Sequence, residues 1–456
     1  MWGAASKRGR SGARVSFEMR RWMKSFVLVT AAFAGGAVTS HLAHAKTQAA
    51  SPYAPFDQLA RVLVLVENQY VEPAARTKVI EGAIKGMVAE LDPHSAYMTP
   101  AEFALFQGET EGKFGGVGVE VDFKNEYITV IAPIDGSPAA RAGIKSGDQI
   151  LAVNGKPMRG ERIDKLVGIM RGPAGSKVRI VVRRPGVAEP MSFDLVREEI
   201  HVTSVVGKRL TGDIGYLRLK QFQDGTHEEL LRTAAKLRGE SKSQLAGVIL
   251  DMRNNPGGLV DEAENVADEF LAAGSIYSTR HRGQVVDEVK AHPGGAFSSL
   301  PIVVLVNEYS ASSAELVAGA LQDARRATVV GAPTFGKGSV QTIFDLPGGA
   351  GLRLTTMRYY TPNGRSIQAQ GIRPDIVIES KQAQTVDVVR ERDLEGHLPA
   401  EGGGTKGPTG KVVVETGARA SDVENARDVP TDPVKGKDFA LSVGYQLLVK
   451  TIGDRR

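Results

Sequence analysis

The sequence predicts a multi-domain α/β protein, and two observations lead to this fold class. Within 247–270, and again within 301–321, a buried apolar run passes through a short polar loop into a segment with helical spacing of its apolar residues. Strands that alternate with helices form a mainly parallel sheet, with functional loops at the carboxyl ends of the strands. Ahead of this pattern, residues 114–184 contain short strands and two short helices in another order, which indicates a separate domain inserted before the sheet.

The composition limits both the chemistry and the partners. The 456 residues include no cysteine, which excludes thiol nucleophiles, disulfides and thiolate metal sites. The formal net charge is +5, but residues 1–45 contain seven Lys/Arg and one Glu, so the remainder carries about −1. Lys and Arg in that remainder are spread evenly among acidic residues. Because a nucleic-acid partner requires a clustered positive face, none is expected.

Residues 1–45 have the pattern of an export signal. A basic flank precedes the apolar run 26–38, and Ala43-His44-Ala45 fits a small-x-small cleavage site. We therefore expect an exported protein of the periplasm or cell envelope. If the leader is not cleaved, it would instead anchor the protein at the membrane.

The rest of the chain divides into regions of different character. Residues 53–110 have helical spacing, interrupted at 91–100 by LDPHSAYMTP, a predicted turn to which we assign no chemistry. Beyond Ser380 the composition becomes polar, and EGGGTKGPTGK is typical of a flexible linker. The predicted divisions are a signal peptide at 1–45, a helical N-terminal region at 46–113, the small domain at 114–185, the α/β core at 186–380, a flexible linker at 381–435 and a C-terminal helix at 436–456.

The order of elements in the small domain resembles a PDZ domain. Consecutive glycines allow backbone N–H groups to converge on a terminal carboxylate, while the adjoining strand edge pairs with an extended peptide. The predicted carboxylate-binding loop consists of Gly115, Gly116, Val117, Gly118 and Val119. We therefore expect this domain to bind peptides.

The two strand-to-helix loops of the core contain candidate catalytic groups. In SASSAE, Ser312 falls at a predicted helix start, where free N–H groups and the helix dipole favour developing negative charge. Ser312 and Glu315 equally fit a capping box, a common way to begin a helix. The glycine loop at 254–258 fits either a tight turn or an oxyanion hole that a glycine N–H forms with the N–H of Ser313. The local sequence leaves both alternatives open.

Lys337 has two alternative roles. The segment 331–337, GAPTFGK, is close to a phosphate-binding P-loop, but Gly338 stands where that motif needs a hydroxyl and the next residues alternate as a strand. The second role is a general base, because desolvation lowers the pKa of a lysine and lets it take a serine proton. The scattered histidines, His94 among them, have no local catalytic signature and are expected to be surface or packing residues. A triad assembled from distant residues stays open.

Four motifs in order resemble the carboxyl-terminal processing proteases, also called tail-specific proteases, of the S41 serine peptidases. The motifs are DMRNNPGG, VNEYSASSAELVAGAL, TFGKGSVQ and YYTPNGRSIQAQGIRPDI, with the PDZ-like domain ahead of them. The similarity covers about 55–380. It implies a crotonase/ClpP-like α/β protease core with an inserted PDZ domain and a helical N-terminal region.

The resemblance implies roles for individual residues. Ser312 would be the nucleophile, Lys337 the general base, and Gln341 the residue that orients the lysine amine. Gln341 follows Lys337 by an even spacing, which predicts that both lie on one face of a strand. The chain departs from the family at Ser313, since the family often has SASAAE or SASASE where this chain has SASSAE. The family pattern places the nucleophile at the second serine of SAS, which is Ser312.

The oxyanion donors implied by the resemblance are the N–H groups of Ser313 and of Gly257 or Gly258. In this family the PDZ domain captures the C-terminus of the substrate and gates the active site. Arg171, in MRGPAG at the PDZ boundary, lies where family members couple the PDZ position to the catalytic residues.

We therefore expect an exported serine endopeptidase that cleaves envelope proteins with apolar C-termini, without a metal or organic cofactor. The resemblance further suggests an activating adaptor protein and a homo-oligomer. Two alternatives come from other classes. One is an envelope scaffold with a PDZ domain and a catalytically dead protease fold, and the other is a nucleotide hydrolase that uses the 331–337 loop.

Overall fold

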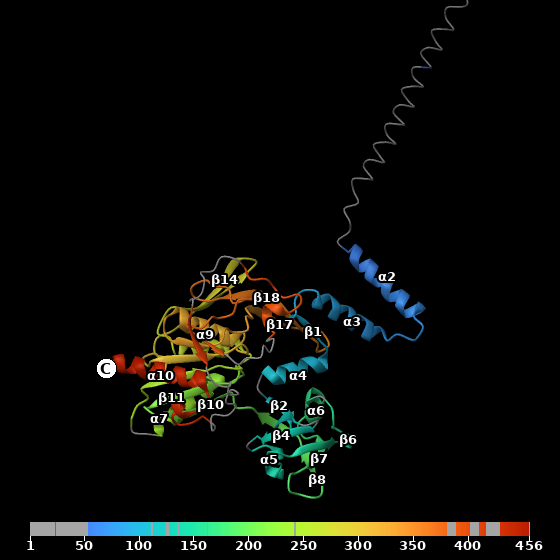
Figure 1. Cartoon of the computed structure of the whole chain (residues 1–456). Coiled ribbons are helices and arrows are strands. Elements are labelled where there is room, and N and C mark those ends of the chain that lie inside the picture. Colours follow the sequence, from blue (N-terminus) through green and yellow to red (C-terminus); the bar gives the residue numbers. More distant parts are fainter. Residues whose placement is uncertain are drawn as a thin grey trace, which may run out of the picture. The chain divides into compact units, whose positions relative to one another are not determined.

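We describe the chain from a computed structural model, drawn in Figure 1. The structure describes Met23 and residues 53–110, 113–124, 127–134, 136–161, 163–240, 243–380, 389–401, 410–415 and 429–455. Apart from Met23, the predicted leader lies outside the described residues. The chain forms two compact units, 1–83 and 84–456, and each is described by itself.

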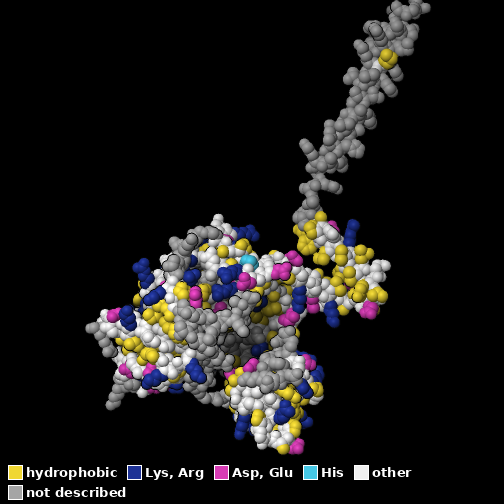
Figure 2. Space-filling view, viewed as in Figure 1, with side chains coloured by type: hydrophobic (Ala, Val, Ile, Leu, Met, Phe, Trp, Pro, Cys, Tyr) yellow, Lys and Arg dark blue, Asp and Glu magenta, His cyan; other side chains and the backbone are white. Residues whose placement is uncertain are grey.

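Within its described residues, the first unit exposes most of its apolar side chains. Helix α2, Ala54–Gln69, buries none of its residues, and α3, Arg76–Ala89, begins in this unit. Phe56 and Leu65 on α2 are 65% and 59% exposed, and Figure 2 shows hydrophobic side chains gathered over these helices. On the face drawn there, Lys/Arg and Asp/Glu side chains are interspersed, as the composition predicted. Among the described residues, no helix has both the length and the apolar character needed to span a membrane.

The predicted PDZ domain forms its own hydrophobic core in the second unit. Its six-stranded sheet has the order β3-β4-β5-β7-β8, with β6 paired to β5, so that β3 is an edge strand. Val178, Ile180 and Val182 on β7 are buried, which explains the alternation in SKVRIVVRR. The elements are β3 Val119–Lys124, β4 Tyr127–Pro133, α5 Pro138–Ala142, β5 Gln149–Val153, β6 Lys156–Pro157, α6 Ile163–Met170, β7 Lys177–Arg183 and β8 Met191–Val196.

The domain continues past residue 185, its predicted end. Strand β8 pairs with β7, and β9, Glu198–His201, pairs with β2, Lys113–Gly116. The start and the end of the domain are thereby hydrogen-bonded to each other. Helix α4, Pro100–Thr110, precedes β2.

The core contains a seven-stranded sheet of order β10-β11-β12-β15-β16-β19-β20. All neighbours are parallel except β10 and β11, which confirms the predicted mainly parallel sheet. The strands are β10 Val205–Leu210, β11 Ile214–Leu219, β12 Gly247–Asp251, β15 Ile302–Val306, β16 Thr328–Gly331, β19 Ile376–Ser380 and β20 Lys411–Glu415.

Helices cover both faces of this sheet. Alternate residues point to opposite faces, so Val248 and Leu250 on β12 pack with α7, α8 and α9, while Ile249 packs with α10, coloured red in Figure 1. A strand buried on both faces reads as a continuous apolar run, which is the pattern that the sequence displays. The helices are α7 Thr226–Gly239, α8 Val260–Asp268, α9 Ser313–Asp323 and α10 Phe439–Arg455.

A second, five-stranded sheet has the order β1-β18-β13-β14, with β17 paired to β18. Its strands are β1 Ala96–Met98, β13 Ser275–His281, β14 Gln284–Lys290, β17 Ser339–Asp345 and β18 Gly351–Tyr360. Because β1 lies next to β18, the segment after α3 is built into the core.

Parts of the predicted linker at 381–435 belong to the core, which corrects the linker prediction for those parts. Strand β20 pairs in parallel with β19, and the 3-10 helix η1, Glu391–Asp393, contains a fully buried Glu391. A second 3-10 helix, η3, spans Pro433–Lys435. The strand KVVVE was not predicted from the sequence, because the residues around it are rich in glycine and charged side chains.

Candidate active site

Ser312 lies at the turn between buried strand β15 and buried helix α9. Its backbone has φ +54° and ψ −119°, a conformation that non-glycine residues rarely adopt. Strained backbone is concentrated at active sites, and a strained strand-to-helix turn is how α/β hydrolases present a serine. The next serine, Ser313, is fully buried, and its hydroxyl donates to the Gly258 carbonyl at 2.9 Å. This geometry supports Ser312 over Ser313 as the reactive serine.

The buried carboxylate of Glu315 joins the serine turn to the lysine loop. It accepts hydrogen bonds from the Thr334 hydroxyl and from the N–H groups of Ser312 at 2.8 Å, Gly336 at 2.8 Å and Lys337 at 2.9 Å. Burial raises the pKa of Glu315 to about 7, against the lowering effect of these hydrogen bonds. Since every partner donates, the ionised form satisfies all of them. Glu315 therefore does more than cap α9.

Lys337 lies between β16 and β17. The chain enters a strand after it and not a helix, so the P-loop alternative is wrong. Burial lowers the pKa of Lys337, and the positive charge of Arg353 lowers it further against Glu391, Asp92 and Glu315. Within the described part of the chain, its amine forms no hydrogen bond or ion pair. The surroundings thus favour a neutral amine, the state that a general base requires.

One cavity of about 400 Å³ brings the predicted catalytic side chains together. Ser312, Lys337 and Gln341 all line it, together with Gly257 and Gly258. No hydrogen bond among the described residues joins the Ser312 hydroxyl to the Lys337 amine. The two groups therefore face a shared space without being engaged.

Gln341 reaches the cavity by a route that its spacing did not predict. The premise that Lys337 and Gln341 share a strand is wrong, because β17 begins only at Ser339. The pairing of β17 with β18 also shifts register between Val340 and Gln341, and such a bulge turns side chains to a new direction. The Gln341 amide nitrogen donates to the hydroxyls of Ser339 at 3.0 Å and Thr355 at 3.2 Å.

The glycine loop lies directly against Ser312. A Cβ at Gly257, where φ is +98°, would come within 2.7 Å of the Ser312 Cβ, so only glycine fits there. The Gly257 N–H donates to the Asn255 side chain at 2.8 Å and is therefore occupied. The N–H groups of Gly258 and Ser313 donate to no other described residue. Of the two predicted glycines, Gly258 is the one with a free donor.

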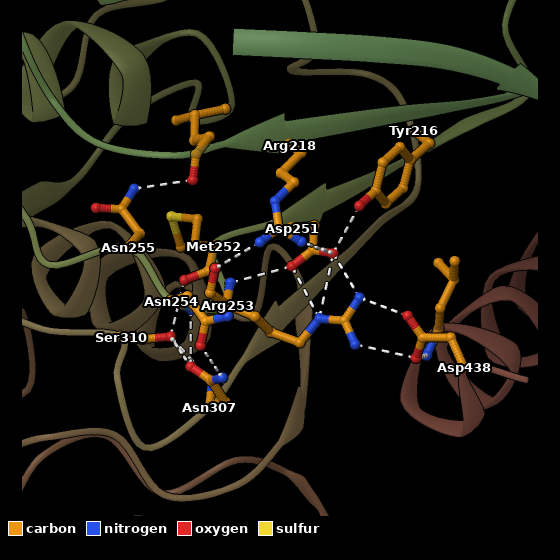
Figure 3. A network of polar contacts seen from close by, with 12 residues as sticks. Tyr216, Arg218, Asp251, Met252, Arg253, Asn254, Asn255, Asn307, Ser310 and Asp438 are labelled. Atoms are coloured by element: carbon orange, nitrogen blue, oxygen red, sulfur yellow. Dashed lines mark hydrogen bonds and ion pairs between the residues drawn. The ribbon is translucent and has the colours of Figure 1, made fainter. Parts of the chain in front are cut away.

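A buried polar network, drawn in Figure 3, anchors this loop to the core. Arg253 pairs with Asp251 at 2.6 Å and with both oxygens of Asp438, which precedes α10, at 3.0 and 2.8 Å. Asn254 donates its N–H to the Asn307 side chain at 2.9 Å, and the Asn307 amide donates back. The network fixes the loop between β12 and α8 through an ion pair of buried Asp251 and Arg253, and charged hydrogen bonds are strong in such an environment.

In the PDZ domain, the predicted carboxylate-binding segment is partly strand. Gly115 and Gly116 end β2 and Val119 begins β3, so that the loop itself is Val117 and Gly118. The Val117 side chain is buried, and both loop carbonyls accept hydrogen bonds from within the domain. The N–H groups of Val117 and Gly118 form no hydrogen bond to any other described residue. These N–H groups lie at the start of the edge strand β3.

Arg171, the predicted coupling residue, lies at the end of the PDZ helix α6. It follows α6 directly, donates its N–H to the Val167 carbonyl at 2.8 Å, and does not line the cavity described above. In the described ranges, no three His, Asp or Glu side chains group in a way that would hold a metal ion.

Comparison with known proteins places this arrangement in a family. A model of peptidase family S41 matches residues 213–378, and a PDZ domain model matches 129–184. A model of the activating protease CtpB N-terminal domain matches 12–101. The chain is 43% identical over 402 residues to a carboxy-terminal-processing protease of Bartonella bacilliformis, covering 86% of this chain and 88% of that protein. The chain belongs to peptidase family S41.

Other S41 proteins are also similar to this chain. A probable CtpA-like serine protease of Staphylococcus aureus is 36% identical over 339 residues, which is 74% of this chain and 67% of that protein. Among solved structures, the photosystem II D1 C-terminal processing protease is 30% identical, with 70% of this chain and 86% of that chain covered and a TM-score of 0.45. As an S41 member, the protein is a serine-type peptidase with a PDZ domain, and PDZ domains bind peptides.

Sequence reasoning missed several residues that shape the S41 site. Arg353 lines the cavity, and Asp92 and Glu391 contribute charge near Lys337, although these residues are far apart in the chain. His94, expected at the surface or in packing, is within 2.7 Å of the buried Glu391 carboxylate. The S-x-x-E spacing signalled Glu315, but only as a cap. No local pattern connects the other residues to the dyad.

Proposed function

We propose that this S41 peptidase cleaves proteins with a Ser312–Lys337 dyad assisted by Gln341. The observation that carries the proposal is the shared cavity. A serine with strained backbone and a lysine whose pKa is lowered by burial both line it. Serine–lysine pairs are an established variant of nucleophilic catalysis. A lysine with lowered pKa also needs no histidine partner to act as a base.

In the proposed reaction, the neutral Lys337 amine takes the proton of the Ser312 hydroxyl as its oxygen attacks the scissile carbonyl carbon. The N–H groups of Ser313 and Gly258 donate hydrogen bonds to the carbonyl oxygen and stabilise its negative charge. The C–N bond then breaks, and the lysine ammonium returns the proton to the leaving amine. Water, activated by the same lysine, hydrolyses the acyl-enzyme and frees Ser312. Since the two side chains are not hydrogen-bonded here, the proposal includes a small closing movement in the working state.

We further propose that substrates are selected by their C-terminal tails. The free N–H groups of Val117 and Gly118 beside edge strand β3 suit a terminal carboxylate and an added strand. The apolar cavity walls, which include Phe106, Ile343 and Tyr359, suit unfolded apolar segments. Envelope proteins exposed after export are the proposed substrates, and the leader-like residues 1–45 support a periplasmic or envelope location. The match to the CtpB N-terminal domain supports regulation by an activating partner.

The dyad is tested with the full chain on fluorescein-labelled casein, an unfolded general substrate. Ser312→Ala and Lys337→Ala should each lower kcat by about 1000-fold or more, because each removes a group of one catalytic unit. Lys236→Ala, an exposed lysine on α7, is the matched control and should cleave at the normal rate. Thermal unfolding should be nearly the same in all of these proteins. Normal turnover by Lys337→Ala would contradict the proposed Ser312–Lys337 dyad.

The scaffold alternative makes a different prediction in the same assay. A catalytically dead scaffold would bind a peptide with an apolar C-terminus yet leave casein intact in the wild-type protein. Cleavage that disappears in Ser312→Ala excludes that alternative.

A further inference from the structure

A turn far from the dyad in the sequence contacts several groups around Lys337. Residues 92–95, called here the Asp92 turn, lie between α3 and β1. Asp92 is 5% exposed, and its carboxylate accepts hydrogen bonds from the N–H groups of His94 at 2.8 Å and Ser95 at 2.9 Å. It also accepts the Ser95 hydroxyl at 2.8 Å. Burial opposes ionisation of Asp92, but these hydrogen bonds outweigh it and lower the pKa.

The first branch from the turn runs to Gln341. Thr355 donates its hydroxyl proton to the Asp92 carboxylate at 3.1 Å. A hydroxyl has only one proton, so toward Gln341 the same oxygen can act only as an acceptor, and it takes the Gln341 amide N–H at 3.2 Å. The other amide hydrogen goes to Ser339 at 3.0 Å. An ionised Asp92 thereby fixes which way the amide points and leaves its carbonyl oxygen as the group available to the Lys337 amine.

The second branch runs from His94 to Arg353 and Glu391, two charged residues near Lys337. The His94 carbonyl accepts a hydrogen bond from Arg353 Nε at 2.9 Å. The His94 ring lies 2.7 Å from one oxygen of Glu391, whose other oxygen accepts from the Gln368 amide at 2.8 Å. Gln368 in turn accepts the N–H of Gly338, the residue after Lys337, at 3.0 Å. The same short turn therefore contacts neighbours of the lysine on two different segments.

We propose that the Asp92 turn is the positioning element of the general base, with Asp92 setting the amide orientation of Gln341 through Thr355. This rests on the proposed dyad, in which Gln341 orients Lys337. Without the carboxylate, Thr355 is free to donate to the Gln341 carbonyl, and the amide can turn its N–H groups toward the lysine. A lysine amine faced by donors loses the acceptor that aims it at Ser312.

A double-mutant cycle on casein cleavage tests the positioning role. Asp92→Ala should lower kcat by about tenfold to 100-fold with little change in KM, the size typical of a misplaced catalytic group. In a Gln341→Ala background, the same change should cost less than about threefold, because the group it positions is already gone. A merely structural contribution would be equal in the two backgrounds.

Two variants of the connecting hydroxyl sharpen the test. Thr355→Ser keeps a proton donor for Asp92 and should retain most of kcat. Thr355→Val removes donor and acceptor and should match Asp92→Ala. The matched control is Asp375→Ala, since Asp375 also accepts a backbone N–H, from Val329 at 2.8 Å, but is not among the charges that shift the pKa of Lys337. It should lose stability and keep kcat.

The pH profile separates positioning from charge. Asp92, Glu391 and Glu315 raise the pKa of Lys337, while Arg353 and burial lower it. Removing the Asp92 charge should therefore move the acid limb of kcat/KM to lower pH, which by itself favours the neutral base. A fall in kcat together with that shift reports lost positioning.

Two failures are distinguishable. If Ser312→Ala and Lys337→Ala still cleave casein, the proposed dyad fails. If those variants are inactive but Asp92→Ala retains full kcat, or costs the same with and without Gln341, the Asp92 turn has no positioning role.

Discussion

The serine side and the lysine side of this active site are built in different ways. The proposed nucleophile Ser312 and the glycine loop come from two neighbouring strands of one parallel sheet, β15 and β12. Lys337 instead lies between β16 of that sheet and β17 of the five-stranded sheet. Its neighbours Arg353, Glu391 and Asp92 come from three distant segments.

The difference shows how each half obtains its geometry. On the serine side, parallel strands end at the same edge of the sheet, so adjacent loops meet there and are joined directly by hydrogen bonds such as that from Asn254 to Asn307. On the lysine side, the arrangement depends on hydrogen bonds between segments that the sheet does not bring together. The lysine side is therefore the half that distant changes can alter while the serine turn stays in place.

Outside the proposed dyad, the largest effect is expected at Glu315, the residue that both sides share. Glu315→Gln replaces an acceptor with an amide whose N–H groups would face the N–H groups of Ser312 and Lys337. We expect kcat on casein to fall by about 100-fold or more, since small displacements of reacting groups cost this much. Steady-state kinetics with circular dichroism would measure it.

A matched control for Glu315 is available on α8. Glu262 also accepts backbone N–H groups, from Gly225 at 3.2 Å and His227 at 2.7 Å, but neither partner belongs to the serine turn or the lysine loop. Glu262→Gln should keep kcat. Near-normal turnover in Glu315→Gln would show that the two sides are not coupled through this carboxylate.

An intermediate effect is expected from a change on the serine side alone. Gly257→Ala places a methyl group 2.7 Å from the Ser312 Cβ at φ +98°, which displaces the serine turn. We expect kcat to fall by about tenfold to 100-fold, with the acid limb of the pH profile unchanged because Lys337 keeps its neighbours. Gly283→Ala is the control, since its φ of +82° is similarly strained but nothing lies within 4 Å of the added Cβ. Equal losses in both variants would assign the effect to backbone strain.

The smallest effect is expected from a charge on the lysine side. Arg353 lowers the pKa of Lys337, so Arg353→Met should raise it and move the acid limb of kcat/KM to higher pH. The sign follows because a neutral lysine is needed and is populated only above its pKa. Glu315, Glu391 and Asp92 face Lys337 in both proteins, so the difference reports Arg353.

Arg238→Met is a close match for this test. Arg238 donates to a backbone carbonyl at 2.8 Å and stacks over Phe297 at 5.6 Å, much as Arg353 does over Phe106 at 5.7 Å. It lies outside the cavity and should leave the pH profile unchanged. If the acid limb of kcat/KM stays at the same pH in Arg353→Met, then Arg353 does not lower the pKa of Lys337.

Much of the fold was readable from short-range pattern. Continuous apolar runs such as PIVVLV predicted strands buried on both faces, and β12 and β15 are such strands. The two short helices predicted within 114–184 are α5 and α6, and α5 ends with a left-handed cap at Gly143. KVVVE was missed because five residues in a polar context give too weak a signal.

The sequence by itself determined the kinds of groups present: a serine at a helix start, a glycine loop at a strand end, and a lysine in a loop that no P-loop pattern completes. These are local properties of spacing and residue type. Only the tertiary structure decided which glycine keeps a free N–H, which side Gln341 faces, and which charges surround Lys337. The physical reason is that hydrogen-bond saturation and desolvation depend on partners hundreds of residues away, and no local pattern records them.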